Sequence, residues 1–314
     1  TKRGHSGRPT WSVEMDQGFS RALPFGPDPS EAPPSDTIFS CATIVSNQCQ
    51  GTVQQYRDSF PSRFAGLPMK GVSRAGGTSS YMFIDPWLRN AYRQRYAVSV
   101  GGGGESLRYF VSGTMSDADG VLPNDNENKK VIRGNFSFTP LSNLLFDWNT
   151  SYTKDYISNT AAGNNAHRMT LNAFRRDRNY ASNDRPEIMD KLLNQEITSE
   201  IDHLITGGTT TWSPLQNFTN KFTVGWDMAQ IGNRNLRPFG FISAPAGIIS
   251  DRQNIYQTLT FDYAGNYNRA LTSDLRGTIS WGGQSVTTEN RSTSAYGEGS
   301  LDTAWFGIPP GGLA

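Results

Sequence analysis

The sequence predicts an all-β fold, an antiparallel up-and-down meander of about nine strands that forms part of an open β-barrel. Two observations support this prediction: apolar and polar residues alternate in many segments, and the connections between those segments alternate between short and long. The segment 144–155 has the clearest alternation, which a helix would scatter around its circumference. One face of this segment carries Leu144, Phe146, Trp148, Thr150 and Tyr152, and the other carries Asp147, Asn149, Ser151, Thr153 and Asp155.

The same period of two returns along the whole chain, before and after this segment. Each further segment has aromatic or aliphatic residues on one face and polar residues on the other, as a sheet with one wet side requires. Together with 144–155 they make about nine strands. The segments are 11–20, 94–100, 107–116, 132–139, 203–212, 221–229, 258–267 and 275–281.

The lengths of the connections indicate the topology. Short connections alternate with long ones, so consecutive strands run antiparallel and all long loops meet at one rim. The short connections fall at 101–106, 140–143, 214–217 and 268–274, and the long ones at 21–93, 117–130, 157–202, 233–254 and from 287 onward. A loose helical spacing predicts some helix in two of the long connections, at 164–175 and 186–197.

Composition narrows the classes of function. A formal net charge of +1 gives no reason to expect a nucleic-acid partner. Hydrophobic residues make up only 36%, and no run of about 18 apolar residues is present, which excludes a transmembrane helix. In the strands of a membrane barrel, apolar residues alternate with polar ones and form no continuous apolar run, so a barrel in a membrane remains possible. Alternation alone does not separate a membrane barrel from a soluble sandwich, because their apolar faces point in opposite directions.

The sequence contains no recognisable catalytic or metal-binding constellation. Its three histidines, His5, His167 and His203, are far apart and lack neighbouring Cys or His residues, so neither an enzyme nor a cofactor is expected. Cys41 and Cys49 lie eight positions apart in a Pro- and Ser-rich stretch. This spacing fits a disulfide in an oxidising compartment, and two unrelated thiols are the alternative.

Four segments together resemble the SusC/RagA-like group of TonB-dependent outer-membrane transporters. These are Gly7-Arg8-Pro9-Thr10-Trp11, 94–121 with its Gly-rich turn, 133–152, and 186–204. The resemblance implies that 1–10 is the end of a plug domain and that 11–314 is the first part of a transmembrane barrel with short periplasmic turns and long extracellular loops. It further implies that the signal peptide and most of the plug precede residue 1, and that the barrel continues beyond residue 314.

The resemblance implies import of an oligosaccharide or a peptide across the outer membrane of a Gram-negative bacterium. The expected partners are a SusD-like surface lipoprotein, a TonB-type energising protein and the lipid of the outer membrane. A passive porin or an adhesin barrel is the first alternative. A secreted β-rich carbohydrate-binding protein is the second.

Two groups of residues are candidates for contact with the solute. Aromatic side chains in loops can stack on sugar rings, although packing of the loops explains them equally. These are Tyr81, Trp87 and Tyr92 before the second strand, and Phe239 and Phe241 in a later loop. On the polar face, Asp155, Asp227 and Asp262 near strand ends are expected to line the solute path or to hydrate the pore wall.

Overall fold

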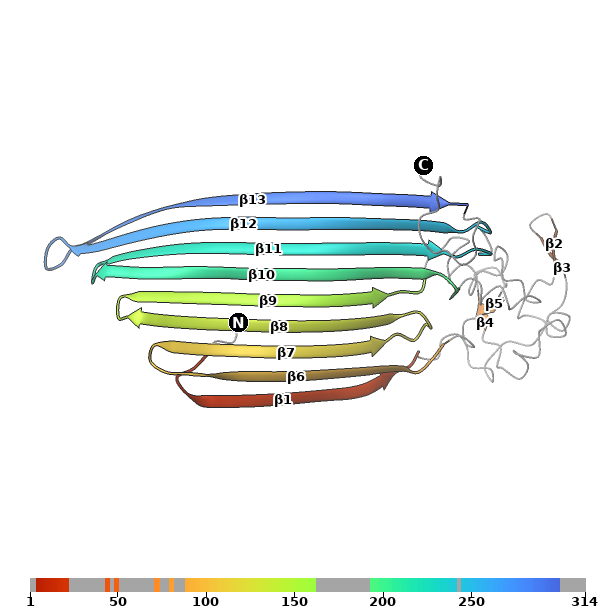
Figure 1. Cartoon of the computed structure of the whole chain (residues 1–314), viewed down its shortest axis with the longest axis horizontal. Coiled ribbons are helices and arrows are strands. Elements are labelled where there is room, and N and C mark those ends of the chain that lie inside the picture. The colour runs from red at the N-terminus through yellow and green to blue at the C-terminus, as the bar shows by residue number, and fades with distance from the viewer. Residues whose placement is uncertain are drawn as a thin grey trace.

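The computed structural model describes residues 4–22, 43–45, 48–50, 71–73, 79–81, 88–161, 193–241 and 244–299. Within these ranges the chain forms one nine-stranded sheet in which every strand pairs antiparallel with its sequence neighbours (Figure 1). Its strands are β1 (Gly7–Ser20), β6 (Ala91–Gly103), β7 (Leu107–Asp119), β8 (Asn126–Leu141), β9 (Leu144–Ser158), β10 (Glu196–Leu215), β11 (Phe218–Arg237), β12 (Ile248–Ala270) and β13 (Arg276–Glu298). The predicted all-β, open meander of about nine strands is confirmed.

Two pairs of short strands lie between β1 and β6, and no alternation of apolar and polar residues predicts them. One pair joins β2 (Thr43–Val45) to β3 (Gln48–Gln50), and the other joins β4 (Gly71–Ser73) to β5 (Ser79–Tyr81). Cys41 lies outside the described residues, and so does the side chain of Cys49 in β3, so the disulfide stays a prediction.

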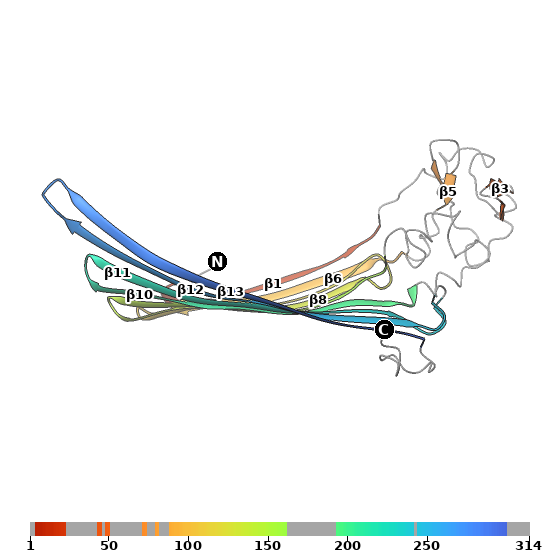
Figure 2. The ribbon, with the colours of Figure 1, turned by 90° about the horizontal axis from the view of Figure 1, so that it is seen from above.

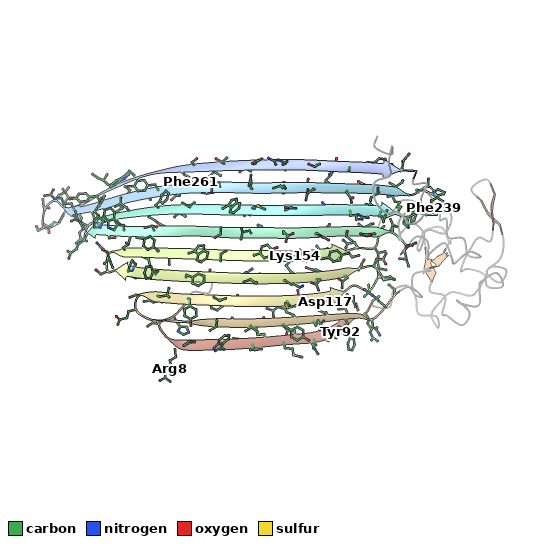
Figure 3. All side chains as sticks on the ribbon, viewed as in Figure 1. Arg8, Tyr92, Asp117, Lys154, Phe239 and Phe261 are labelled. Carbon is green, nitrogen blue, oxygen red and sulfur yellow. The ribbon has the colours of Figure 1, made fainter. Side chains whose placement is uncertain are left out.

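Seen along its edge, the sheet is a single twisted and curved layer (Figure 2). Large apolar side chains on one face are therefore left open: Trp148 is 49% exposed, Trp226 38% and Phe261 40%. Figure 3 places Phe261 on this single layer. Among the described residues the buried apolar side chains are only Ala91, Ala161, Phe241 and Ile249. The described part of the sheet thus has no compact core, as expected of a surface that another medium must cover.

The register aligns the apolar residues of neighbouring strands across the whole sheet. Val13 of β1 lies opposite Val98 of β6, and Phe136 of β8 lies opposite Trp148 of β9, with ring centroids 5.1 Å apart. Farther along, Val224 of β11 lies opposite Phe261 of β12. Because the side-chain period is two, one register keeps most large apolar residues on one side and most polar residues on the other, with Phe110 of β7 and Tyr256 of β12 among the exceptions on the polar side. We name these the apolar face and the polar face.

The short connections are tight, and two of them share one irregularity. The turn between β8 and β9 and the turn between β10 and β11 each leave two residues between strands. Both hairpins shift register just before the turn, between Phe138 and Leu141 and between Trp212 and Leu215. Pro140 and Pro214 lie within these steps. Proline has no N–H for the ladder, so an irregular pair at a strand end accommodates it.

At the opposite rim the strands continue beyond the predicted boundaries. The predicted limits of the long connections 117–130, 157–202 and 233–254 are wrong, because β8, β10 and β12 begin inside them and β11 ends inside the last. β13 likewise runs to Glu298, past the predicted end of its strand. Residues 233–235 pair with 250–252, and both segments are polar on both faces. Pairing between strands needs only backbone hydrogen bonds, so the strands continue beyond the positions where apolar and polar residues alternate.

The predicted helices fall mostly outside the described ranges. Segment 164–175 lies wholly outside them. Of segment 186–197, Glu196 and Ile197 begin strand β10, so the prediction of helix is wrong at these two positions. They pair with Leu236 and Asn235 of β11, which extends the sheet at the long-loop rim. Among the described residues, no helix has the length and apolar character to cross a membrane.

Candidate functional site

The polar face carries the three predicted carboxylates, each on a different strand. Asp155 in β9 lies opposite Lys129 and Ile201, Asp227 in β11 lies opposite Ile205 and Thr258, and Asp262 in β12 lies opposite Thr223 and Gln284. All three are on the side opposite the large aromatic residues. They occupy different heights along the strands, so the sheet does not bring them together into one cluster.

The three carboxylates differ in their surroundings. Asp155 is buried, at 5% exposure, and accepts a hydrogen bond of 2.8 Å from the Lys129 ammonium. Asp227 is exposed, and its Oδ1 lies 2.7 Å from Nε2 of His203. Asp262 is half-buried. Only Asp227 and Asp262 are therefore open enough to meet a solute directly, whereas Asp155 holds a neighbouring strand.

The predicted aromatic residues are placed in three different situations. Tyr92 lies within β6, opposite Phe19 on the apolar face, and not in the preceding connection where the sequence placed it. Phe241 is buried at 2% exposure in the β11–β12 loop, while Phe239 beside it is exposed (Figure 3). Trp87 and the side chain of Tyr81 lie outside the described residues. Of these aromatic residues, Phe239 is the one seen exposed in a loop, and Tyr92 is exposed within its strand.

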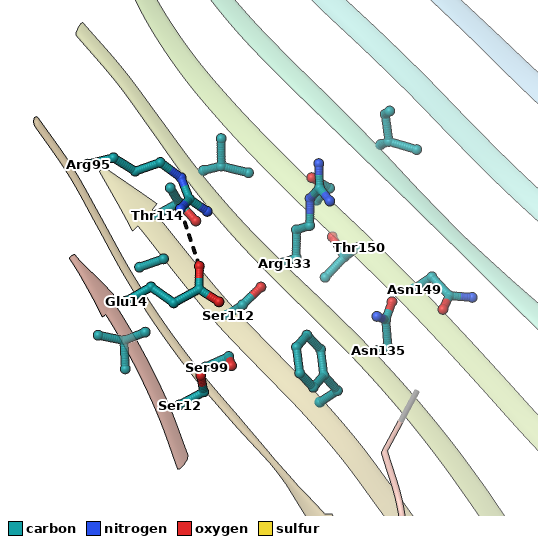
Figure 4. Close-up of a pocket in the computed structure, with 16 residues that line it drawn as sticks. Ser12, Glu14, Arg95, Ser99, Ser112, Thr114, Arg133, Asn135, Asn149 and Thr150 are labelled. Carbon is teal, nitrogen blue, oxygen red and sulfur yellow. Dashed lines mark hydrogen bonds and ion pairs between the residues drawn. The ribbon is translucent and has the colours of Figure 1, made fainter. Parts of the chain in front are cut away.

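A hollow of about 710 Å³ opens on the polar face between β1 and β9 (Figure 4). Its volume is in the range of small-molecule binding sites. Charged residues at one side form a bridge across β1 and β6: Nη1 of Arg95 lies 3.2 Å from Glu14 and 3.0 Å from Asp16. Arg133 of β8 also lines the hollow. Alternation assigns these residues to the polar side of their strands, but only the register shows that they share a site.

The long-loop rim is held by one hydrogen-bonded network centred on the β7–β8 loop. The side chain of Arg89, just before β6, donates to the carboxylate of Asp119 at 3.0 Å and to the carbonyl oxygens of Gly120 and Asp125 at 3.0 and 2.8 Å. The carboxylate of Asp125 in turn accepts a hydrogen bond of 2.6 Å from the backbone N–H of Thr160, which follows β9. The six-residue loop between β7 and β8 thus contacts both the end of the β1–β6 connection and the segment that follows β9.

Asn124 extends the network to the start of β10. Its amide donates to the carbonyl oxygen of Leu193 at 2.6 Å, and Gln195 beside it is buried. Three separate connections are therefore fixed at one point of the rim. No sequence motif predicts this network. The residues that its hydrogen bonds join are between 30 and 71 positions apart in the sequence.

Replacing Arg89 by alanine is expected to loosen this rim without unfolding the sheet. Three side-chain hydrogen bonds are lost, and since the Arg89 side chain is about one-third exposed we expect local opening to become about tenfold more frequent. Hydrogen exchange of the Gly120 and Asp125 amides measures it. Arg93→Ala, which removes an exposed arginine from neighbouring β6, is the matched control. Equal exchange in both variants would contradict the role given to Arg89.

Within the described ranges, no group of three or more His, Cys, Asp or Glu side chains is arranged to hold a metal ion. Several charged groups of the polar face are instead joined in pairs between adjacent strands, as in the Lys129–Asp155 and Arg95–Glu14 contacts. Such an arrangement provides a hydrated surface with hydrogen-bonding groups along it. It is suited to contact with a solute or another polar surface.

No protein-family model matches the chain, and no curated protein matches it. Solved structures do match over 100% of the chain at 16% identity: the RagAB peptide importer in the closed-closed state (TM-score 0.68), the RagAB peptide transporter (0.68), and the importer in the open-open state (0.69). The chain spans 39%, 39% and 38% of the length of those chains. It therefore shares the fold of the part of the RagAB chains that it covers, and the SusC/RagA-like resemblance read from the sequence is confirmed at the level of the fold.

Proposed function

We propose that this chain forms part of the barrel wall of an outer-membrane transporter that imports a nutrient, either an oligosaccharide or a peptide. The observation that carries the proposal is the uncovered apolar face of a single-layer sheet whose other face is polar. Lipid is the medium that such a face fits, with water on the polar side. Among the described residues, the outer strands β1 and β13 each have one unpaired edge, which in lipid requires further strands beside it.

The proposed transport is energised and involves binding and gating, not the breaking of bonds. The solute is delivered at the long-loop rim by a SusD-like surface lipoprotein and passes along the polar face, where exposed groups such as Asp227 and Asp262 are available to it. A TonB-type protein acts from the side of the short turns through a plug, whose end or linker is residues 1–10, while 11–314 belong to the barrel. The last four of these ten residues already lie in β1. The match to structures of a peptide importer supports a peptide as one class of solute.

Uptake of labelled oligosaccharides and peptides by cells that produce the full-length protein tests the proposal. We expect uptake to disappear when the TonB-type protein is deleted, and to fall when the gene of the surface lipoprotein is deleted. Uptake that continues without the TonB-type protein would identify a passive porin. A full-length protein that high-salt and carbonate washes release from the membrane fraction would instead identify a secreted binding protein.

A further inference from the structure

Arg133 is a cation without a partner on the polar face of β8. The structure gives it no hydrogen bond or ion pair in the described part of the chain, and Figure 4 draws none to it. Its direct cross-strand neighbours are Ser112 of β7 and Ser151 of β9. The diagonal positions on these two strands are also neutral: Phe110, Thr114, Asn149 and Thr153.

Two other cations of the polar face already have their counter-charges. Arg95 is bound by Glu14 and Asp16, and Lys129 is bound by Asp155. Glu14, Asp16 and Asp155 are thus engaged elsewhere, and Asp147 accepts a hydrogen bond from the hydroxyl of Ser137. A guanidinium with five donors and no carboxylate bound to it is well suited to bind an anion, above all a planar carboxylate.

The surroundings of Arg133 are suited to an anion that arrives from outside the chain. Hydroxyl and amide groups of Ser112, Asn149 and Ser151 line the same hollow of about 710 Å³, and each of them can donate a hydrogen bond to a carboxylate oxygen (Figure 4). Arg133 itself is exposed, so its charge is available to the hollow.

We propose that Arg133 is a receptor for a carboxylate group of the imported solute, which makes acidic peptides or acidic oligosaccharides the preferred cargo. This inference rests on the proposed transport function and adds a class of solute to it. Arg133 binds the carboxylate through its guanidinium, and the neighbouring hydroxyl and amide groups complete the contact. Neutral solutes pass the same surface without this interaction.

Binding of two matched pairs of probes to the purified full-length protein tests the inference. One pair is a glutamate-containing heptapeptide with a free carboxyl terminus and its glutamine-containing, amidated counterpart. The other is tetragalacturonic acid and neutral galactotetraose. We expect the wild-type protein to bind the acidic member of at least one pair about tenfold more tightly, as a single hydrogen-bonded charge pair provides. Arg133→Gln removes this preference and leaves the affinity for neutral probes unchanged.

Lys221→Gln is the matched control, since it removes a positive charge from the same face outside the hollow. The control keeps the preference, and Arg133→Lys retains part of it. Two results would overturn the inference. One is a preference for the acidic probe that survives Arg133→Gln. The other is an equal loss of affinity for acidic and neutral probes, which would assign Arg133 to a contact with the plug. Equal binding of acidic and neutral probes by the wild-type protein would reject the role of Arg133 as a carboxylate receptor and leave the proposed transport function untouched. Absence of binding together with absence of TonB-dependent uptake rejects the proposed function as well.

Discussion

Replacing Trp148 by arginine is expected to destabilise the barrel in its bilayer by about 2–4 kcal/mol, the cost of a charged side chain on the lipid side near the bilayer centre. Trp148 is the middle residue of the apolar face of β9, four positions from both Leu144 and Tyr152. The change also removes the stacking on Phe136 and the hydrogen bond of 2.9 Å from the indole to Thr206. Urea titration of the full-length protein folded into lipid vesicles measures the loss.

Asn149→Arg is the matched control for this prediction. It introduces the same side chain at the next position of the same strand, on the polar face, where water hydrates the charge. We expect its effect on the free energy of unfolding to stay within about 0.5 kcal/mol, as for other exposed substitutions. A control that destabilises the protein as much as Trp148→Arg would contradict the assignment of the two faces.

The second large effect is expected at Lys129. Changing Lys129 to methionine leaves the Asp155 carboxylate buried without its counter-charge, and removal of one partner of a buried pair costs roughly 3–5 kcal/mol. The side chain of Lys129 is 41% exposed, so solvent screens part of the interaction and we expect a loss of about 2 kcal/mol. The midpoint of urea unfolding, compared at constant slope, gives the value.

The double variant Lys129→Met/Asp155→Leu checks the mechanism of this loss. Because it removes both charges, no buried carboxylate is left uncompensated, and most of the stability returns. A double variant as unstable as Lys129→Met would show that packing of the lysine stem, and not the charge, accounts for the effect. Lys129 and Asp155 lie directly opposite each other, so their effects must be measured in this combined way.

The middle of every strand except β13 could be predicted from the sequence, and most strand ends at the long-loop rim could not. In β9 one face carries Phe146 and Trp148 while the other carries Asp147 and Asn149. In the proposed barrel, lipid and water impose these opposite demands on neighbouring positions. Near the long-loop rim of that barrel both faces meet water. Residues 233–235 and 250–252 are therefore polar throughout, and no alternation marks the strand that they form.

The candidate site was only partly visible in the sequence. Alternation assigned Asp155 and Arg133 to the polar face, but their partners depend on the register, which sequence pattern alone does not specify for a polar face. His203 and Asp227 approach to 2.7 Å although 24 positions separate them. The prediction that Tyr92 precedes its strand is wrong, because the strand already begins at Ala91, which pairs with Ser20. The residue type could not show this, since an aromatic residue fits both a loop and the apolar face of a strand.

Accessibility along β9 distinguishes an apolar face that meets lipid, with water on the polar face, from an apolar face sealed in a soluble core. Spin labels are introduced singly at positions 146 to 151 of the full-length protein in vesicles, after replacement of Cys41 and Cys49. We expect strong relaxation by oxygen at 146, 148 and 150, and strong relaxation by a water-soluble nickel complex at 147, 149 and 151. Labels at 146 and 148 that neither reagent reaches, as in a sealed soluble core, would contradict the contact of the apolar face with lipid.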